Sequence, residues 1–358
     1  MGKRLILHIG GGKCGSSAIQ DYLAANHAKM MQNGVLTPDQ TLGTKGPFKS
    51  EQIFFFENLD LTHNATEVLR EKFANLLGFM NKKGQDTLIV SAENLSQLSF
   101  VPAVLARVVL SIFDDVRVVF YVRRQDDYMI SAWQQWGLKT YRDIITYIDK
   151  EARPMADWAA LLAPWEAAFG PDRLIVRPFQ RNRMVDGDVV EDFLSVLNLP
   201  HKGCIPLSKL SNRSFDEHLG DMAHRIRDVF DGPHDNRMYD VMVRVLGDPI
   251  FKTQSGSHLL TLSDRLKILE QYATGNEEIK ERYLPELGDE PLFKPPTAKD
   301  VITLDDIDKL RGENEVLLRM FYVLTAKFEK LTRKPPRHSL KYLIKTRLGL
   351  IPRDEHDI

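Results

Sequence analysis

The chain has 358 residues, of which 43% are hydrophobic and 27% charged, proportions typical of a globular protein. This composition excludes a disordered, collagen-like or disulfide-scaffold protein. The 48 basic and 49 acidic residues give a formal net charge of −1, so no overall positive field predicts nucleic acid as a partner. The two cysteines, Cys14 and Cys204, are too few for a Cys-rich metal site, and they indicate a reducing compartment, the cytoplasm.

Short apolar runs alternate with helical patterns over the first 200 residues. The runs predict buried strands at 5–9, 35–37, 87–91, 117–122 and 174–176. Helical patterns cover 16–31, 68–77, 101–113, 158–169 and 189–197, with further helices up to residue 147. Such alternation predicts parallel βαβ units and a three-layer αβα domain, with ligand sites at the carboxyl ends of its strands. No stretch approaches the roughly 18 apolar residues of a membrane span, and the first run is too short for a signal peptide.

After Pro200 only helices are predicted, at 215–230, 264–272 with Ser263 as a cap, 277–283 and 305–328. We therefore divide the chain into an α/β core (1–200), a helical acceptor-side extension of the same domain (201–330) and a basic tail (331–358). The tail differs in composition, because 330–353 holds eight Lys or Arg and no acid.

A glycine-rich loop follows the first predicted strand. Residues 10–17 read Gly-Gly-Gly-Lys-Cys-Gly-Ser-Ser and lead directly into a predicted helix. Glycines let backbone N–H groups approach an anion, and the start of a helix adds unpaired donors and a favourable dipole. Lys13 adds a positive charge, and Ser16 and Ser17 add hydroxyls. The loop therefore predicts a phosphate site, the alternative being a plain turn with a serine cap.

Several phosphate-loop patterns can be compared with these residues. A Walker A loop fails because Leu7 stands where its first glycine belongs. The dinucleotide fingerprint is met by Gly10, Gly12 and Gly15, with Asp39 as the downstream acid. That pattern has no use for Lys13, and Pro38 disrupts the strand end that should present the acid. An NAD(P)-dependent Rossmann oxidoreductase remains the alternative enzyme.

Residues 12–20 also resemble the first loop of the sulfotransferases that use 3′-phosphoadenosine 5′-phosphosulfate (PAPS), which reads close to Pro-Lys-x-Gly-Thr-Thr-x-Leu-Gln. The chain has Gly12 for Pro and serines for both threonines. The resemblance implies that Lys13, Gly15, Ser16 and Ser17 hold the 5′-phosphosulfate. Ala18 departs from members that place an aromatic residue there to stack on adenine.

A second motif follows the strand predicted at 117–122. Arg123 stands at the strand end, Ser131 eight residues later and Trp133 ten residues later. An arginine and a serine in this arrangement can converge on one anion. The spacing resembles the 3′-phosphate motif of the same family, and Arg124-Gln125 in place of Asp-Pro is similar to divergent bacterial, glycan-type members.

The resemblance implies a P-loop NTPase-like sulfotransferase fold, PAPS as co-substrate without a metal, and a hydroxyl of a carbohydrate or glycan precursor as acceptor. Glu93 follows the strand at 87–91, where a carboxylate could take the proton of an attacking hydroxyl. Glu93 and Lys13 are thus the expected catalytic residues, with His8 and the acids of 48–60 as substitutes. Cys14 stands at a helix start, which favours thiolate, although sulfuryl transfer needs no thiol. A binding scaffold without turnover is a further alternative.

The basic tail predicts a short amphipathic helix beginning at Ser339 and ending near Leu348. Basic amphipathic segments lie on anionic bilayers, so the tail predicts peripheral contact with the inner membrane face. The alternative is a terminal helix docked on its own core.

Overall fold

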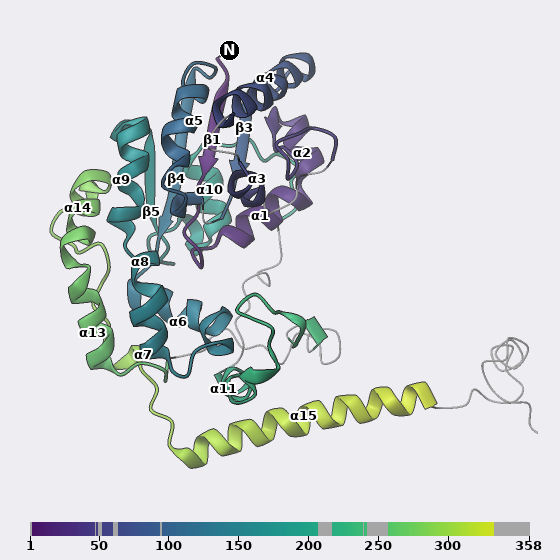
Figure 1. Ribbon diagram of the computed structural model, residues 1–358, viewed down its shortest axis with the longest axis vertical. Coiled ribbons are helices and arrows are strands. Elements are labelled where there is room, and N and C mark those ends of the chain that lie inside the picture. Colours follow the sequence, from purple (N-terminus) through teal and green to yellow (C-terminus); the bar gives the residue numbers. More distant parts are fainter. Residues whose placement is uncertain are drawn as a thin grey trace, which may run out of the picture. The chain divides into compact units, whose positions relative to one another are not determined.

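The computed structural model describes residues 2–46, 48, 52–59, 64–93, 95–206, 217–238, 240–241 and 257–332 (Figure 1). It divides into two compact units, one made of Met1–His234 with Lys252–Thr303 and the other of Asp235–Phe251 with Leu304–Ile358. The domain boundaries expected at 200 and 330 stay predictions. The tail from residue 333, with its expected membrane helix, lies outside the described residues.

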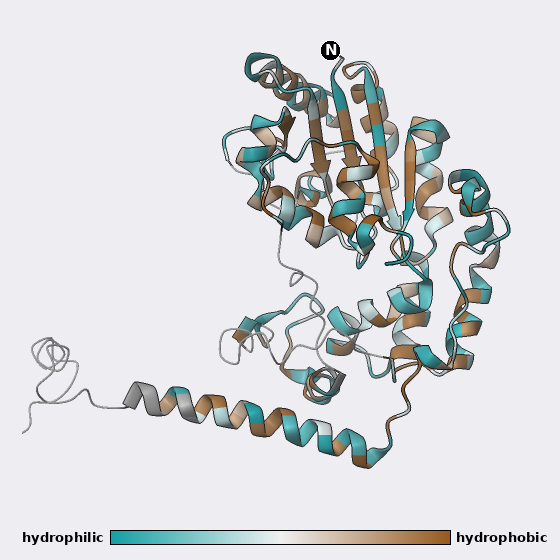
Figure 2. Cartoon of the chain, turned by 180° about the vertical axis from the view of Figure 1, so that it is seen from behind, coloured by the Kyte–Doolittle hydropathy of each residue, from teal (hydrophilic) through white to brown (hydrophobic). Residues whose placement is uncertain are grey.

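The first unit is built on a five-stranded parallel sheet of order β2-β3-β1-β4-β5. Its strands are β1 (Arg4–His8), β2 (Val35–Leu36), β3 (Thr87–Ser91), β4 (Asp115–Val122) and β5 (Leu174–Pro178). Figure 2 shows them as mostly hydrophobic, as expected of a sheet covered on both faces. The predicted parallel α/β architecture is confirmed.

Two groups of helices flank the sheet. Helices α4, α5 and α9 pack beside one another, and α1 packs against α10, which confirms the three-layer arrangement. The helices of this part are α1 (Ser16–Ala25), α2 (His27–Gln32), α3 (Ile53–Glu57), α4 (Ala65–Lys83), α5 (Val101–Val109), α9 (Trp158–Phe169) and α10 (Val189–Val196).

The single helix predicted at 16–31 is two helices, and Asn26 explains the break. Its side-chain amide donates to the carbonyl oxygens of Tyr22 and Ile205, and its side-chain oxygen accepts the Ile205 N–H at 2.7 Å. A buried asparagine that bonds to backbone groups competes with the helical hydrogen bonds and favours a break.

The chain after β4 forms α6 (Gln125–Gln135), α7 (Ile144–Tyr147), a π-helical turn (Ile148–Ala152) and α8 (Arg153–Met155). The later helices are α11 (Glu217–Arg225), α13 (Leu262–Gln271), α14 (Ala273–Tyr283) and, in the second unit, α15 (Asp306–Thr332). Helix α13 packs on α6, and α14 packs on α9. The cap of α13 is Thr261, which forms a reciprocal capping box with Asp264, so the prediction of Ser263 was wrong.

Single 3₁₀ turns complete the described structure, at Leu95–Gln97, Gly137–Lys139, Pro171–Arg173, Val185–Gly187, Arg227–Val229, Pro285–Leu287 and Ala298–Asp300. Among the helices that the structure describes, none combines the length and the apolar character needed to cross a bilayer.

Candidate functional site

The candidate site lies where the carboxyl ends of the central strands meet. Strand β1 pairs with β3 on one side and with β4 on the other, so the loops after all three strands leave the sheet at one edge. This is the switch point at which open parallel sheets bind ligands. The glycine loop crosses the end of β4 closely, since a Cβ on Gly11 would stand 3.0 Å from the Tyr121 carbonyl oxygen.

Backbone conformation explains the glycines of this loop. Gly10 has φ +44°, and a Cβ there would lie 2.7 Å from the Ser16 hydroxyl oxygen. Gly15 has φ +86°, and its Cβ would lie 2.7 Å from the ring of Phe179. Lys13 adopts φ 61° although it is not a glycine, a left-handed conformation that costs roughly 1–2 kcal/mol. The loop is therefore held in a shape that few other sequences would tolerate.

Lys13 is the cation at the centre of this loop. Its Nζ donates to Oε1 of Gln135 at 2.6 Å, and its carbonyl oxygen accepts from Nη1 of Arg123 at 2.9 Å. Burial, and next the charge of Arg123, lower the pKa of Lys13 to about 8, although Glu93 opposes the shift. The structure thus brings together Lys13 and Arg123, which are 110 positions apart in the chain.

Glu93 is the third predicted residue at this edge. The turn that carries it is fixed to the glycine loop, because the Ala92 N–H donates to the His8 carbonyl at 3.0 Å and the Ser96 hydroxyl donates to the Gly10 carbonyl at 3.2 Å. The Lys13 backbone N–H donates to the Glu93 carboxylate. Burial raises the pKa of Glu93, and the charge and N–H of Lys13 offset this in part. A carboxylate and two cations therefore share the site.

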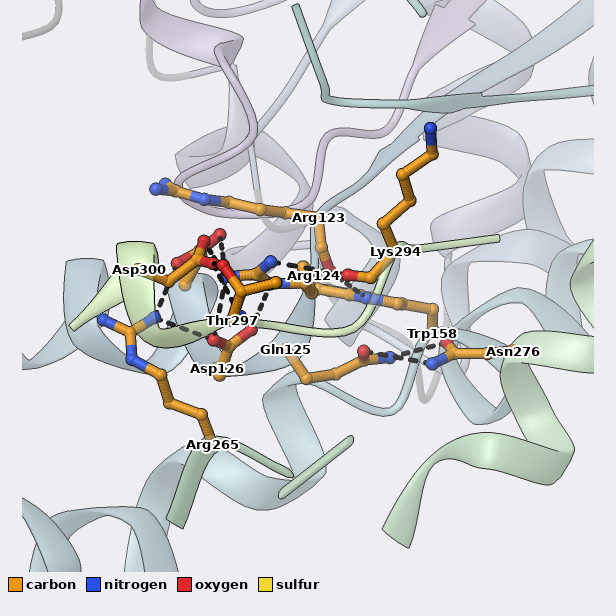
Figure 3. Close-up of polar contacts among 11 residues, drawn as sticks. Arg123, Arg124, Gln125, Asp126, Trp158, Arg265, Asn276, Lys294, Thr297 and Asp300 are labelled. Carbon is orange, nitrogen blue, oxygen red and sulfur yellow. Dashed lines mark hydrogen bonds and ion pairs between the residues drawn. The ribbon is translucent and has the colours of Figure 1, made fainter. Parts of the chain in front are cut away.

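Arg123 begins the connection from β4 to α6. Its guanidinium carbon lies 5.8 Å from the centre of the Phe179 ring, and its carbonyl oxygen accepts from Nε1 of Trp158 at 2.8 Å. In Figure 3 its guanidinium lies outside the group of carboxylates around Arg124. Arg123 forms no ion pair with any residue that the structure describes, so its charge is available to an anion.

The structure connects the predicted serines less clearly with the site than it connects Lys13, Glu93 and Arg123. The Ser16 hydroxyl donates to the Gly11 carbonyl at 3.3 Å, and Ser17 is exposed in the first turn of α1. Ser131 is buried on α6, and within the described part of the chain no hydrogen bond joins it to Arg123 or Lys13. The roles of these serines stay predictions.

Trp133 of the second motif is a packing residue. Its ring lies 5.9 Å from that of Tyr147 and 5.1 Å from that of His224. The aromatic residue of this motif thus packs α6 against its neighbours.

Three residues of the site did not emerge from the sequence: Gln135, Trp158 and Phe179. Phe179 directly follows β5, so its position at the carboxyl edge was a readable signal. Gln135 ends α6, and no local pattern connects the end of that helix with Lys13. Trp158 begins α9 and reaches Arg123 only through tertiary packing.

The substitute bases are less suitable than Glu93. His8 is fully buried, its Nδ1 lies 2.8 Å from the Ser91 hydroxyl, and its ring contacts Phe193. Burial lowers the pKa of His8 to about 4. Among the acids of 48–60, Glu57 is exposed on α3, while Glu51 and Asp60 lie outside the described residues.

The features of the dinucleotide pattern are not assembled in this sheet. Its acid should follow a strand beside β1, whereas β2, which precedes Asp39, pairs with β3. The Asp39 carboxylate instead accepts the backbone N–H groups of Thr41, Gly43 and Lys45. Burial raises the pKa of Asp39, but a hydrogen bond from the Thr41 hydroxyl and these backbone bonds prevail and lower it.

Cys14 is a buried residue of the glycine loop. The thiol is completely buried, and burial raises its pKa to about 12, which outweighs the preference for thiolate at a helix start. The residue fills space beneath the loop. As for metals, no group of three or more His, Cys, Asp or Glu residues in the described ranges could hold an ion.

Comparisons with known proteins give distant similarities. No family model matches the chain. An uncharacterized protein of Archaeoglobus fulgidus is 27% identical over 205 residues, which cover 55% of this chain and 53% of that protein. The chain thus spans about half the length of the curated relative that it matches.

Two solved structures also align with part of the chain. A sulfotransferase from Alicyclobacillus acidocaldarius aligns with a TM-score of 0.36 and 14% identity, over 58% of this chain and 88% of its own. The sulfotransferase domain from the curacin biosynthetic pathway aligns with a TM-score of 0.32 and 14% identity, over 68% of this chain and 96% of its own. The chemistry of this chain must therefore be argued from its own residues.

Proposed function

We propose that this chain transfers a sulfuryl group from PAPS to a hydroxyl group of a carbohydrate or glycan precursor. The observation that carries the proposal is the hydrogen bond of 2.9 Å from Arg123 to the Lys13 carbonyl, which unites the two anion motifs at one sheet edge. A donor with phosphates at both its 5′ and 3′ positions needs two such cationic groups. Because the lysine loop and the strand-end arginine lie side by side, the site favours such a donor over a nucleotide that carries phosphate at its 5′ position only.

The residues present fit a doubly anionic ligand. Neither Lys13 nor Arg123 forms an ion pair with a described residue, and Glu93 is one nearby negative charge for two cations, which leaves an unfavourable excess of positive charge. An anion bound here would relieve that cost. We assign the 5′ side of the donor to Lys13, Gly15, Ser16 and Ser17, and its 3′-phosphate to Arg123 and Ser131.

The chemistry assigns a separate task to Glu93. The donor supplies an activated sulfuryl group, and the acceptor hydroxyl must lose a proton as it attacks. A carboxylate whose pKa is raised by burial is a stronger base than an exposed one, and it is still ionised when the pH exceeds that value. Lys13, with the loop N–H groups, stabilises negative charge at the leaving side. Catalysis thus needs the loop and Glu93 together.

A thermal-shift panel tests the choice of nucleotide, because a ligand that binds only the folded state raises the apparent stability. We expect 3′-phosphoadenosine 5′-phosphate to raise the melting temperature more than adenosine 5′-phosphate, ATP, NAD or NADP do. Equal shifts with the first two nucleotides would contradict the 3′-phosphate assignment. A shift with NAD alone would favour the oxidoreductase, and binding without transfer to any glycan would favour a scaffold.

The variant Glu93→Gln tests the base. It keeps the size and hydrogen bonding of the side chain but removes its basicity, so turnover should fall by roughly two to four orders of magnitude. Nucleotide affinity should stay constant or tighten, because a negative charge beside Lys13 is lost. The control is Glu57→Gln, which changes an exposed acid of α3. Loss of nucleotide binding and stability together would instead make Glu93 an anchor of the loop.

The acceptor class is part of the proposal and rests on the resemblance of the two sequence motifs. Contact of the basic tail with anionic membranes would suit a lipid-linked acceptor. It requires salt-sensitive binding to anionic liposomes that disappears when residues 335–358 are removed. Absence of binding at low salt would dismiss the membrane contact without affecting the nucleotide site.

A further inference from the structure

Helix α15 carries an apolar stripe that the described part of the chain leaves exposed. Its members are 49–70% exposed: Ile307, Leu310, Leu317, Phe321 and Leu324. Figure 2 shows hydrophobic residues recurring along this helix. An amphipathic helix in water normally buries such a stripe against another surface. We therefore expect another surface to bury this stripe.

The spacing of the stripe identifies the kind of partner. Positions 307, 310, 314, 317, 321 and 324 alternate steps of three and four residues, which is the a/d heptad of a coiled coil. Leucine occupies the d positions 310, 317 and 324, and in the sequence Phe328 and Leu331 continue the spacing. The helix has 27 residues, a length at which a sustained heptad indicates another helix as the partner.

The stripe is distinct from the face of α15 that is already covered. Glu313 and Val316 are buried, at 6% and 9% exposure, whereas Leu317, the next residue, is 49% exposed. Successive residues of a helix point about 100° apart. Val316 is thus on a face separate from the stripe, whereas Glu313 occupies the g position that borders the stripe, so the covered face reaches its edge but leaves the a and d residues exposed.

The one polar residue of the stripe determines the orientation of the partner. Asn314 occupies an a position between Ile307 and Phe321. In a parallel pair of identical helices the a residues face each other, so the two Asn314 amides can hydrogen-bond across the axis. In an antiparallel pair Asn314 would face a leucine of the other helix and lose its polar partner. Asparagine here therefore favours a parallel pair in register.

Charges beside the stripe agree with this orientation. Asp306 occupies a g position and Arg311 the following e position, which meet across the axis of a parallel coiled coil. Both residues are exposed. Each pair of identical helices would form this contact twice because the arrangement is two-fold symmetric.

We propose that α15 is a dimerisation helix that binds α15 of a second copy of this chain as a parallel, in-register coiled coil through Ile307, Leu310, Asn314, Leu317, Phe321 and Leu324. The partner is a second copy because the heptad, the central asparagine and the flanking charges are complementary to themselves. The inference does not depend on the sulfotransferase proposal, since it uses no residue of the site.

Disulfide trapping in the full chain tests the register. Under mild oxidation Asn314→Cys should form a dimer linked by a disulfide, because the two a positions face each other. The matched control is Tyr322→Cys, which changes a residue that is 74% exposed at an outward b position and should stay unlinked. The wild type should also stay unlinked, since Cys14 is buried and Cys204 is half-buried. A dimer in which Asn314→Cys does not cross-link would overturn the parallel register.

Sedimentation of the full chain tests the interface itself. Leu317→Glu should raise the dimer dissociation constant by at least about a hundredfold, because each copy loses a buried leucine and gains a charge. Tyr322→Glu, the control, should leave it unchanged, and circular dichroism verifies that both variants remain folded. A wild type that is monomeric at the concentrations used for oxidation overturns the proposal. A dimer that survives Leu317→Glu overturns it as well, because its interface then lies elsewhere.

Discussion

Arg123 and Arg124 are neighbours in the chain and opposites in their surroundings. Arg123 donates to a backbone carbonyl of the glycine loop, lies over the Phe179 ring and forms no ion pair with a described residue. Arg124 is buried and bonds to Asp126 at 2.7 Å and to Asp300 at 3.1 Å (Figure 3). Arg124 is thus paired with carboxylates, whereas Arg123 has no such partner among the described residues.

The surroundings of Arg124 form a buried ionic cluster that fixes α6 to later parts of the chain. Asp126 is completely buried and also accepts from Arg265 of α13 at 2.8 Å. Beside it, the side-chain amides of Gln125 and Asn276 exchange hydrogen bonds of 2.7 and 3.1 Å. Two adjacent arginines at a strand end therefore differ in what they can bind, because the fold places carboxylates beside only one of them.

The largest effect expected from this comparison is on stability. Arg124→Met removes one of the two cations bound to the buried Asp126, and because Arg265 remains, the cost should lie near the lower end of the roughly 3–5 kcal/mol for a broken buried ion pair. Arg123→Met removes one hydrogen bond to a carbonyl and should cost about 1 kcal/mol. Urea unfolding of both variants measures the difference in stability. The midpoints can be compared directly if the unfolding free energy depends on urea concentration with the same slope in both variants. Similar losses in the two variants would show that the arginines do not differ in role.

Acid should weaken the region of the site through His8. The pKa of His8 is about 4 in the folded chain, against 6.5 for the free side chain. Between these values the unfolded chain binds more protons, so stability is present above pH 6.5 and is lost as the pH falls toward 4. The full loss amounts to about 3 kcal/mol. His8→Gln should lack it, since every other titrating group is common to both proteins, and parallel pH profiles of unfolding free energy would refute this assignment.

On the binding side of the comparison, Arg123→Met should abolish the preference for 3′-phosphoadenosine 5′-phosphate over adenosine 5′-phosphate. The loss should be about 1.5–3 kcal/mol, the usual contribution of a hydrogen bond to a charged group. Calorimetric titration of the two nucleotides measures it. A variant that binds both more weakly by the same factor would place Arg123 near the shared 5′ end of the ligand.

The smallest effect concerns Lys13 and alkaline pH. Its pKa of about 8 means that the ligand-free side chain loses its proton as the pH rises above that value. Nucleotide affinity should then fall by up to about tenfold per pH unit, because binding an anion requires the protonated amine. Lys13→Met should bind weakly with no such dependence. A wild-type affinity that is constant through this range would separate Lys13 from the anion.

The sequence correctly predicted features that depend on neighbouring residues. The five strands were readable because each is a short apolar run between turns, and the run of glycines before Ser16 predicted a tight loop at a helix start. The break at Asn26 and the cap at Thr261 were missed. Both depend on which hydrogen bonds a polar side chain finally makes, and in the case of Asn26 the partner lies 179 residues away.

Tertiary structure alone decided what surrounds each of the predicted site residues. The sequence placed Lys13, Glu93 and Arg123 at strand ends, and parallel strands share those ends, so their proximity was predictable. The sheet order was not, and it is the order that separates Asp39 from the loop and removes the dinucleotide geometry. Asp126 and Asp127 follow both arginines closely in the chain, so the sequence did not show which arginine they would neutralise. The start of α6 places both acids beside Arg124, and tertiary packing adds Asp300 from a distant segment, so the distances in the fold decided which arginine is paired.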